Sequence, residues 1–277
     1  MSLKYPLVDI SKDTKNSKFL TPISKIQGSS TTAFYSISEP NKEFEIYKHN
    51  NCDIISILLR GSGVLGISEH SVYARPGTCG LVTKGTEHFF ANTSHETCVM
   101  VGFFLGADDI DAAGLQIMDS RNTRELDYDK ENNQLESSEG VIVNIDDVNP
   151  EEMDENDGWK ITDFRLPISA KNNSSSTLFR ARFMPGAVHK KHCHRNCDEI
   201  YYIISGHGLA GVGSDRVEVH GGHFHFIPKG VEHWLYNLSE NEPIEVVGLY
   251  CEAGSVNDTG YVYMGDVTIK DLEERTT

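Results

Sequence analysis

Apolar residues fall in short runs along this chain, and the pattern predicts β-strands. Residues 54–59, 200–204 and 245–250 are rich in β-branched and aromatic side chains, and glycine, asparagine and serine turns separate such runs. Short strands at regular spacing are typical of an all-β sandwich or barrel. Helix is expected only in brief turns at residues 109–113 and 269–275.

The sequence also repeats itself. The tripeptide Pro-Ile-Ser at residues 22–24 returns at residues 167–169, an offset of 145 residues. The same offset relates Cys52-Asp53 to Cys197-Asp198 and Glu87-His88 to Glu232-His233. A repeat of this length indicates duplication of a whole domain, because the units of solenoid proteins are shorter.

We therefore expect two tandem units, residues 1–124 and residues 141–277, joined by an acidic linker at residues 125–140. Residues 119–157 hold 14 acidic residues against three basic ones, which is typical of a solvated connector. The apolar stretch 141–145 is expected to form the first strand of the second unit.

Composition excludes several classes of function. A net charge of −16 argues against nucleic acid as a partner, because its phosphates require lysine and arginine. No apolar run approaches the roughly 20 residues of a membrane helix, so no membrane partner is expected. Six cysteines without a paired framework predict reduced thiols and a cytoplasmic protein. The expected partner is a small-molecule substrate, and a homodimer is left open.

Candidate chemistry gathers in the second unit. His192 and His194 lie two residues apart on a predicted strand, so they face the same side. Glu199 begins the next apolar run, and His233 follows a Pro-x-Gly turn. Three imidazoles and one carboxylate suit one divalent transition metal ion, either Fe, Mn, Ni, Co, Cu or Zn.

Here the chain resembles the cupin superfamily, whose two sequence motifs are both complete. The residues that match the first motif are Gly186, His192, His194, Glu199 and Gly206, and those that match the second are Gly222, Pro228, Gly230, His233 and Asn237. The resemblance implies an all-β fold of two tandem double-stranded β-helix (jelly-roll) barrels. It also implies that His192, His194, Glu199 and His233 are the metal ligands.

The first unit carries a degenerate version of this pattern. Tyr47 and Ile54 stand at the places of the first histidine and of the glutamate, whereas His49 and His88 remain. Two imidazoles without the carboxylate make a weak metal site. We expect this barrel to be structural or a metal-free pocket, with His49 and His88 as hydrogen-bonded remnants in the core.

Further side chains are candidates to line the working pocket. Strand alternation places Tyr201 on the same face as Glu199. Arg180 and Arg182 share one face of another predicted strand; facing inward they would bind a carboxylate or phosphate, and facing outward they are surface charge. Residues 223–226 alternate histidine and phenylalanine. Solvent-facing histidines beside buried phenylalanines are the favoured interpretation, and a histidine that supports the metal ligands or acts in acid–base catalysis is the alternative.

The pattern does not choose a reaction, because one cupin site serves many chemistries. The leading hypothesis is a metal-dependent, dioxygenase-like oxidoreductase that acts on a small organic acid or an enol or phenolic substrate. The catalytic candidates are Glu199, Tyr201, Arg180 and Arg182. The alternatives are a metal-dependent isomerase, cyclase or decarboxylase, and a non-enzymatic protein that binds a small molecule.

Overall fold

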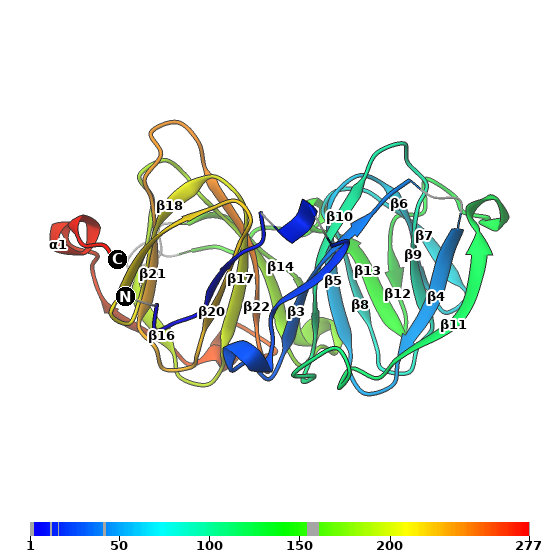
Figure 1. The fold of residues 1–277 in the computed structure, drawn as a ribbon, viewed down its shortest axis with the longest axis horizontal. Coiled ribbons are helices and arrows are strands. Elements are labelled where there is room, and N and C mark those ends of the chain that lie inside the picture. Colours follow the sequence, from blue (N-terminus) through cyan, green and yellow to red (C-terminus); the bar gives the residue numbers. More distant parts are fainter. Residues whose placement is uncertain (1–2, 12, 16, 41–42, 154–160, 277) are drawn as a thin grey trace. The chain divides into compact units, whose positions relative to one another are not determined.

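The computed structural model describes residues 3–11, 13–15, 17–40, 43–153 and 161–276 (Figure 1). The chain divides into two compact units. Lys12–Val148 forms one unit, called here the first barrel, and Met1–Ser11 with Asn149–Thr277 forms the other, called the second barrel. No helix among the described residues is long and apolar enough to cross a membrane.

The first barrel consists of two antiparallel sheets. The larger has the order β12-β13-β8-β5-β10-β3-β2 and the smaller the order β11-β4-β9-β6-β7. The strands are β2 (Phe19–Ile23), β3 (Thr32–Ser38), β4 (Glu43–His49), β5 (Ile54–Arg60), β6 (Gly63–Ile67), β7 (His70–Ala74), β8 (Thr78–Val82), β9 (His88–Asn92), β10 (Cys98–Phe104), β11 (Leu115–Asn122), β12 (Leu135–Glu136) and β13 (Gly140–Asn144).

The second barrel repeats this plan with the sheets β1-β20-β17-β22-β15-β14 and β19-β18-β21-β16-β23. The elements are β1 (Leu7–Asp9), β14 (Thr162–Ile168), β15 (Thr177–Phe183), β16 (Val188–His194), β17 (Glu199–Ser205), β18 (His207–Val212), β19 (Asp215–His220), β20 (His223–Ile227), β21 (His233–Asn237), β22 (Ile244–Tyr250), β23 (Tyr261–Gly265) and helix α1 (Ile269–Glu273). The predicted all-β fold of two jelly-roll barrels is thus confirmed.

The core of the second barrel shows why the strands form as they do. Phe179, Ala181 and Phe183 alternate along β15 and belong to one buried apolar cluster with Tyr201 and Tyr250. Alternation with a period of two places one side of the strand in the barrel interior and the other outside. The interior face is the one that carries the candidate site.

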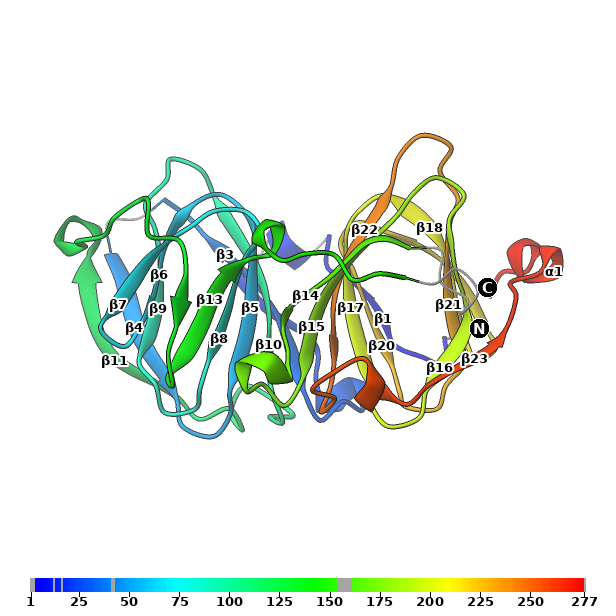
Figure 2. The ribbon, with the colours of Figure 1, turned by 180° about the vertical axis from the view of Figure 1, so that it is seen from behind.

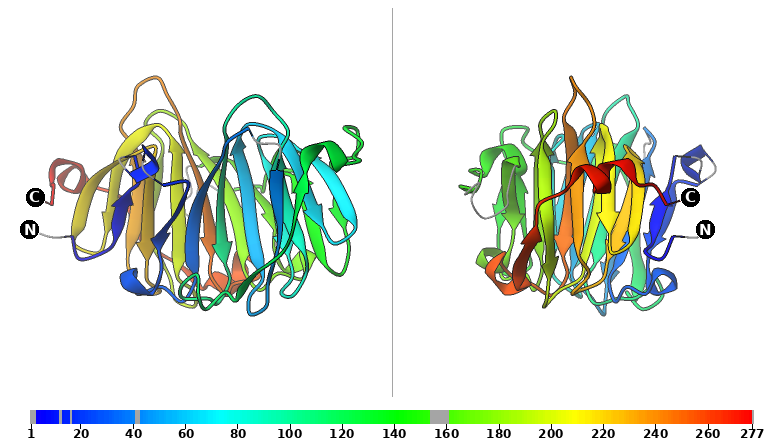
Figure 3. Two further views of the ribbon diagram at one scale, coloured as in Figure 1. Left: turned by 45° about the vertical axis from the view of Figure 1, so that its right-hand side comes forward. Right: turned by 90° about the vertical axis from the view of Figure 1, so that its left-hand side faces the viewer.

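Helix is scarce, as predicted. Helix α1 forms within the expected segment 269–275, and it lies across the outside of the second barrel's strands (Figure 3). Its buried Asp271 pairs with Lys191 at 2.7 Å and with Arg216 at 3.1 Å. Residues 109–113 form a bend and a turn, in agreement with the brief turn expected there, and this segment ends at Gly114, whose φ of +69° is left-handed.

Each barrel's larger sheet includes a strand from the other half of the sequence. Strand β13, expected to open the second unit, pairs instead with β8 in the first barrel, with Val143 opposite Cys79 (Figure 1). Strand β1 pairs with β20 in the second barrel, with Val8 opposite Phe224 (Figure 2). Phe224 lies 145 positions after Cys79, so the two strands occupy equivalent places. The apolar run 141–145 was correctly predicted as a strand but wrongly assigned to the second unit.

The acidic linker also differs from the expectation of a solvated connector. Leu126 and Tyr128 pack against a buried cluster that includes Phe44 and Phe89. The Tyr128 ring stacks on Tyr73 with centroids 6.5 Å apart. Apolar residues between the acidic ones therefore hold residues 126–136, called here the arm, against the first barrel in spite of the segment's negative charge.

Candidate metal centre

Three strands of the second barrel bring the predicted ligands together. His192 and His194 end β16, Glu199 begins β17, and His233 begins β21. Strand β16 pairs with β21, and His192 lies opposite His233 in this register. Because alternate residues of a strand face the same side, His192 and His194 both point into the barrel.

The turn before β21 fixes the position of His233. The backbone N–H of Gly230 donates to the carbonyl of His194 at 2.6 Å, and that of Lys229 donates to Asp198 Oδ1 at 2.8 Å. Gly230 has a φ of +77°, a left-handed conformation that favours glycine. The Pro-x-Gly turn is therefore tied to the ends of both β16 and β17, which carry the other ligands.

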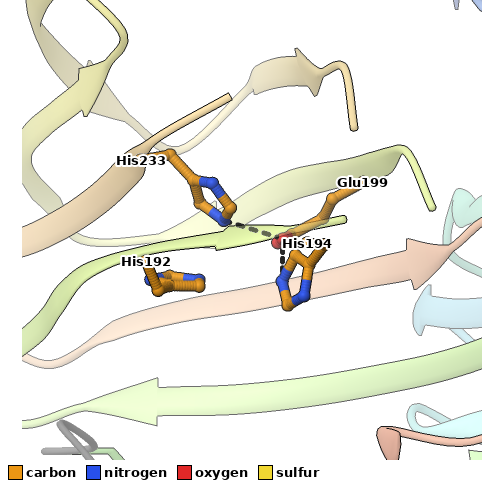
Figure 4. Close-up of side chains that lie close together, drawn as sticks. All are labelled: His192, His194, Glu199 and His233. Atoms are coloured by element: carbon orange, nitrogen blue, oxygen red, sulfur yellow. Dashed lines mark hydrogen bonds and ion pairs between the residues drawn. The ribbon is translucent and has the colours of Figure 1, made fainter. Parts of the chain in front are cut away.

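The four side chains converge on one buried point (Figure 4). One ligand atom from each residue lies within 4.8 Å of the others. Glu199 Oε2 lies 3.1 Å from His233 Nε2 and 3.2 Å from His194 Nε2. The cluster is compatible with one divalent transition metal ion.

Backbone carbonyls set which imidazole nitrogens face this point. Nδ1–H of His192 donates to the carbonyl of Lys190 at 2.7 Å, and Nδ1–H of His233 donates to that of Val231 at 3.0 Å. In a neutral imidazole the opposite Nε2 then carries a lone pair. His233 Nε2 and the Glu199 carboxylate are thus two acceptors 3.1 Å apart, and only a second proton or a cation between them removes the repulsion. A donor set of imidazole nitrogens and one carboxylate fits a transition metal ion.

Burial and charge shape the protonation of these groups. Burial raises the pKa of Glu199, but the hydrogen bonds and charge that His194 and His233 supply when a proton sits on their Nε2 atoms outweigh it and hold this pKa well below its ordinary value. Burial lowers the pKa of His192 and, less strongly, that of His194. At neutral pH the centre therefore presents an ionised Glu199 carboxylate and neutral imidazoles at His192 and His194, the forms that bind metal ions.

A fourth imidazole, His189, also faces the interior, and the sequence analysis did not identify it. Its ring centroid lies 3.8 Å from that of His192, and burial lowers its pKa to about 3. Residues three apart on a regular strand face opposite sides, but a bulge between His189 and His192 turns both inward. The sequence carries no signal for this bulge.

Tyr201 and His225 form a hydrogen-bonded pair beside the centre. They lie opposite each other on β17 and β20, and Tyr201 Oη lies 2.8 Å from His225 Nδ1. Burial, followed by the charge of Glu199, raises the pKa of Tyr201, and burial lowers the pKa of His225 to about 3. The phenol of Tyr201 therefore keeps its proton, and its O–H donates a hydrogen bond to the neutral imidazole of His225.

A cavity of about 30 Å³ adjoins the ligands. Glu199, His189, His233 and Tyr201 contribute polar atoms, and the rest of its wall is mainly aromatic and aliphatic. Since one water needs about 10–15 Å³ by this measure, the cavity has room for about two water-sized groups beside the ligands.

The two candidate arginines do not face this cavity. Phe179, Ala181 and Phe183 line it, so Arg180 and Arg182 project from the opposite side of β15. Arg180 pairs with Asp163 at 2.7 Å and with Glu245 at 3.6 Å, while Arg182 lies 3.6 Å from Glu245. Their placement therefore does not favour the alternative in which both arginines face inward and bind an anionic substrate.

The histidines of β20 are buried rather than solvent-facing. His225 lies opposite the inward-facing Tyr201, whereas Phe224 packs on Tyr202 at the other face. The favoured interpretation from the sequence was therefore wrong, because alternation alone does not tell which face is inward. His223 lies with Asp9 and His220 in a second group of potential ligands, but its Nδ1 accepts a backbone N–H from His220, so Nε2 carries the proton that a metal would have to displace.

The equivalent place in the first barrel holds no such group. Among the described residues, no cluster of three potential ligands includes His49 or His88. Ile54 is buried where Glu199 stands in the second barrel. The difference between the two barrels follows directly from these substitutions.

Comparison with known families agrees with this geometry. Residues 179–250, which span β15 to β22, match the family model described as cupin domain. The second barrel contains a cupin domain. No curated protein sequence matches the chain.

Solved structures show the same two-barrel fold over nearly the whole chain. The oxalate decarboxylase of Lactobacillus farciminis, in a formate complex, superposes with a TM-score of 0.70 at 11% identity and covers 95% of this chain and 90% of its own. The oxalate decarboxylase of Bacillus subtilis gives 0.64 at 12% identity, covering 93% and 73%. AerE from Microcystis aeruginosa gives 0.60 at 17% identity, covering 89% and 97%. At these identities the likeness establishes the bicupin fold, and the chemistry has to come from the site.

Proposed function

We propose that the second barrel is a metal-dependent oxidoreductase of the dioxygenase kind, acting on a small organic acid or an enol or phenolic substrate. His192, His194, Glu199 and His233 would hold one divalent transition metal. The observation that carries this proposal is the convergence of buried acceptor atoms within 4.8 Å, next to a cavity. A metal bound there would supply Lewis-acid chemistry, and a redox-active ion such as Fe or Mn would supply one-electron chemistry as well.

The cavity limits what meets the ligands. Its volume of about 30 Å³ admits two oxygen atoms, such as those of O2 or of one chelating substrate group. Among the described residues that line it there is no lysine or arginine. An anionic group would therefore have to be neutralised at the metal, and the aromatic wall favours a substrate with an apolar part.

Tyr201 and Glu199 are the groups that would act on the substrate. Tyr201 lines the cavity and holds its proton toward His225, so rotation of the O–H would let it donate to a substrate oxygen. Glu199 is ionised and offers an oxygen that can accept a substrate proton. Both lie on the inner face of β17, two residues apart.

Decarboxylation is the second candidate, and the small cavity favours it. A short carboxylic acid fits the available space better than a large ring system does. The fold shared with oxalate decarboxylases agrees with this alternative without deciding for it.

One experiment separates these functions. The metal-free protein is loaded anaerobically with Fe(II) or Mn(II), and O2 uptake and CO2 release are followed with β-diketones, catechols and short carboxylic acids. The proposal expects metal-dependent O2 uptake, absent from a His192→Ala, His194→Ala variant. CO2 release without net O2 consumption supports the decarboxylase instead, and full metal loading without any turnover overturns the enzyme proposal in favour of a binding protein.

A further inference from the structure

The first barrel, which lacks the metal ligands, contains a much larger cavity than the second. Its volume is about 370 Å³, against about 30 Å³ beside the candidate metal centre. Ligand pockets in proteins usually measure about 300–1,000 Å³. Phe19 and Leu115 line the cavity and are 39% and 45% exposed, so it reaches the surface beside them.

The wall of this cavity is mostly apolar and, among the described residues, has no charged side chain, although Ser36, Ser38, Ser56 and Tyr47 add hydroxyl groups to it. Phe34, Phe89, Phe90 and Phe104 supply aromatic surface, and Ile54 replaces the carboxylate of the other barrel. Among the described lining residues there is no lysine, arginine, aspartate or glutamate. An ionic ligand would lose its hydration here without gaining a counter-charge, so the wall selects for a neutral molecule.

Two imidazoles supply hydrogen-bonding groups to the same cavity. The rings of His49 and His88 stack with centroids 5.2 Å apart, and both side chains line the cavity. Nδ1–H of His88 donates to the carbonyl of Thr86 at 3.0 Å, which leaves Nε2 as an acceptor. Nδ1 of His49 is buried without a hydrogen-bond partner, so the expectation of a fully hydrogen-bonded core remnant does not hold for this residue.

A buried nitrogen without a partner costs free energy that a bound ligand can recover. Burial, with the neighbouring His88, lowers the pKa of His49 to about 4, and burial also lowers that of His88. Both rings are therefore neutral at pH 7. A hydroxyl group, which donates and accepts at once, suits two neutral imidazoles better than a carboxylate does.

We propose that the first barrel binds a neutral aromatic alcohol, with the ring against the phenylalanines and the hydroxyl between His49 and His88. The site is separate from the metal centre and needs no metal. In this barrel the positions of two metal ligands are lost, and the interior holds a pocket for an organic ligand instead of a fully packed core.

The test is calorimetric titration at pH 7 with 2-naphthol, which has two fused rings and one neutral hydroxyl. Naphthalene lacks the hydroxyl, and 2-naphthoate replaces it with an anion. We expect 2-naphthol to bind about 10-fold or more tightly than either, since one hydrogen bond contributes about 1–1.5 kcal/mol. Equal or tighter binding of 2-naphthoate overturns the proposal.

Variants locate the site. His49→Phe should weaken 2-naphthol binding about 10-fold, whereas His70→Phe, at an exposed histidine of β7, should not. Ile54→Trp fills the cavity and should abolish binding, and Met100→Trp fills it nearer the surface if the first variant does not fold. The His192→Ala, His194→Ala protein should bind normally. Unchanged binding after His49→Phe and a folded filling variant, or loss of binding without the metal ligands, contradicts the proposal.

Discussion

His189 and His192 stack face to face with ring centroids 3.8 Å apart, although three positions separate them on one strand. The bulge in β16 makes this possible, since it places both rings on the inner face. The imidazole of His189 therefore lies beside the proposed ligands without being one of the four that converge.

His189→Phe tests whether this imidazole is only a neighbour. The phenylalanine keeps the stacked ring and removes both nitrogens, so we expect metal content to stay within about twofold of the wild-type value. Elemental analysis after dialysis against a weak chelator measures this. Loss of the metal from a folded variant would show that His189 is a fifth ligand.

Metal stoichiometry tests the difference between the barrels. We expect one equivalent of transition metal per chain, because the place of Glu199 is taken by Ile54 in the first barrel. The His192→Ala, His194→Ala protein should lose it, while a His49→Ala, His88→Ala protein should keep it. Two equivalents, or retention by the first variant, would contradict this expectation.

Glu199→Gln should separate binding from catalysis. The amide keeps the shape but removes the charge and the base, so we expect turnover to fall about 100-fold or more, with a modest loss of metal affinity. His233→Ala should instead release the metal, because an imidazole ligand is gone. Steady-state rates on an identified substrate, together with metal content, measure both effects. Full activity in a metal-replete Glu199→Gln protein would show that this carboxylate is only a ligand.

Acid should destabilise the first barrel through His49. The pKa of His49 is about 4 in the folded barrel, against an ordinary value of 6.5 in the unfolded chain. Between these two pH values the unfolded chain therefore binds a proton that the folded barrel does not. The contribution of His49 to the free energy of unfolding should then be constant above pH 6.5 and fall as the pH drops, by up to about 1.4 kcal/mol per unit for one proton. Hydrogen exchange of β5 and β9 peptides in urea, from pH 7.5 to 4.5, reports this barrel alone. His49→Phe should reduce the slope and leave a remainder from His88, whose pKa burial also lowers, and an unchanged slope would exclude His49 as a source.

The arm at residues 126–136 should contribute to the stability of the first barrel. Tyr128→Ala removes the stack on Tyr73 and the packing near Phe44, so we expect a loss of about 1–3 kcal/mol. Tyr128→Phe should retain most of this, and Lys130→Ala, at an exposed position, should change little. Chemical denaturation resolves the difference. If the Tyr128→Ala protein is as stable as the wild type, the arm contributes no packing energy and acts as a solvated connector.

The short apolar runs predicted the all-β class, because strand alternation is a local, periodic signal, whereas the barrel type and the four proposed ligands came from the resemblance to the cupin motifs. The spacing of His192 and His194 fixes a shared strand face, and the 145-residue repeat shows where the ligands are missing. Their convergence within 4.8 Å agrees with that reading.

Other features depend on register and on distant pairing, which periodicity does not encode. The bulge that turns His189 inward adds no distinctive residue, and the alternation in β20 gives two faces without saying which is inside. The apolar run of β13 announces a strand but not that its partner is β8. The volume of the first barrel's cavity depends on how completely many side chains fill the interior, so no single sequence position predicts it.

Strands β1 and β13, which each pair in the barrel formed mainly by the other half of the sequence, limit the order in which this chain can fold. Leu7 is made before its partner His225, which follows 218 residues later in the chain, so β1 has no strand to pair with until β20 has been made. By contrast, β13 follows its partner β8 within about sixty residues, which lets the first barrel close while the second is still being made. A cut between residues 124 and 141 would leave each fragment carrying, or lacking, a strand that belongs to the other barrel. The two halves of the sequence are thus interdependent folding units, although each barrel has a core of its own.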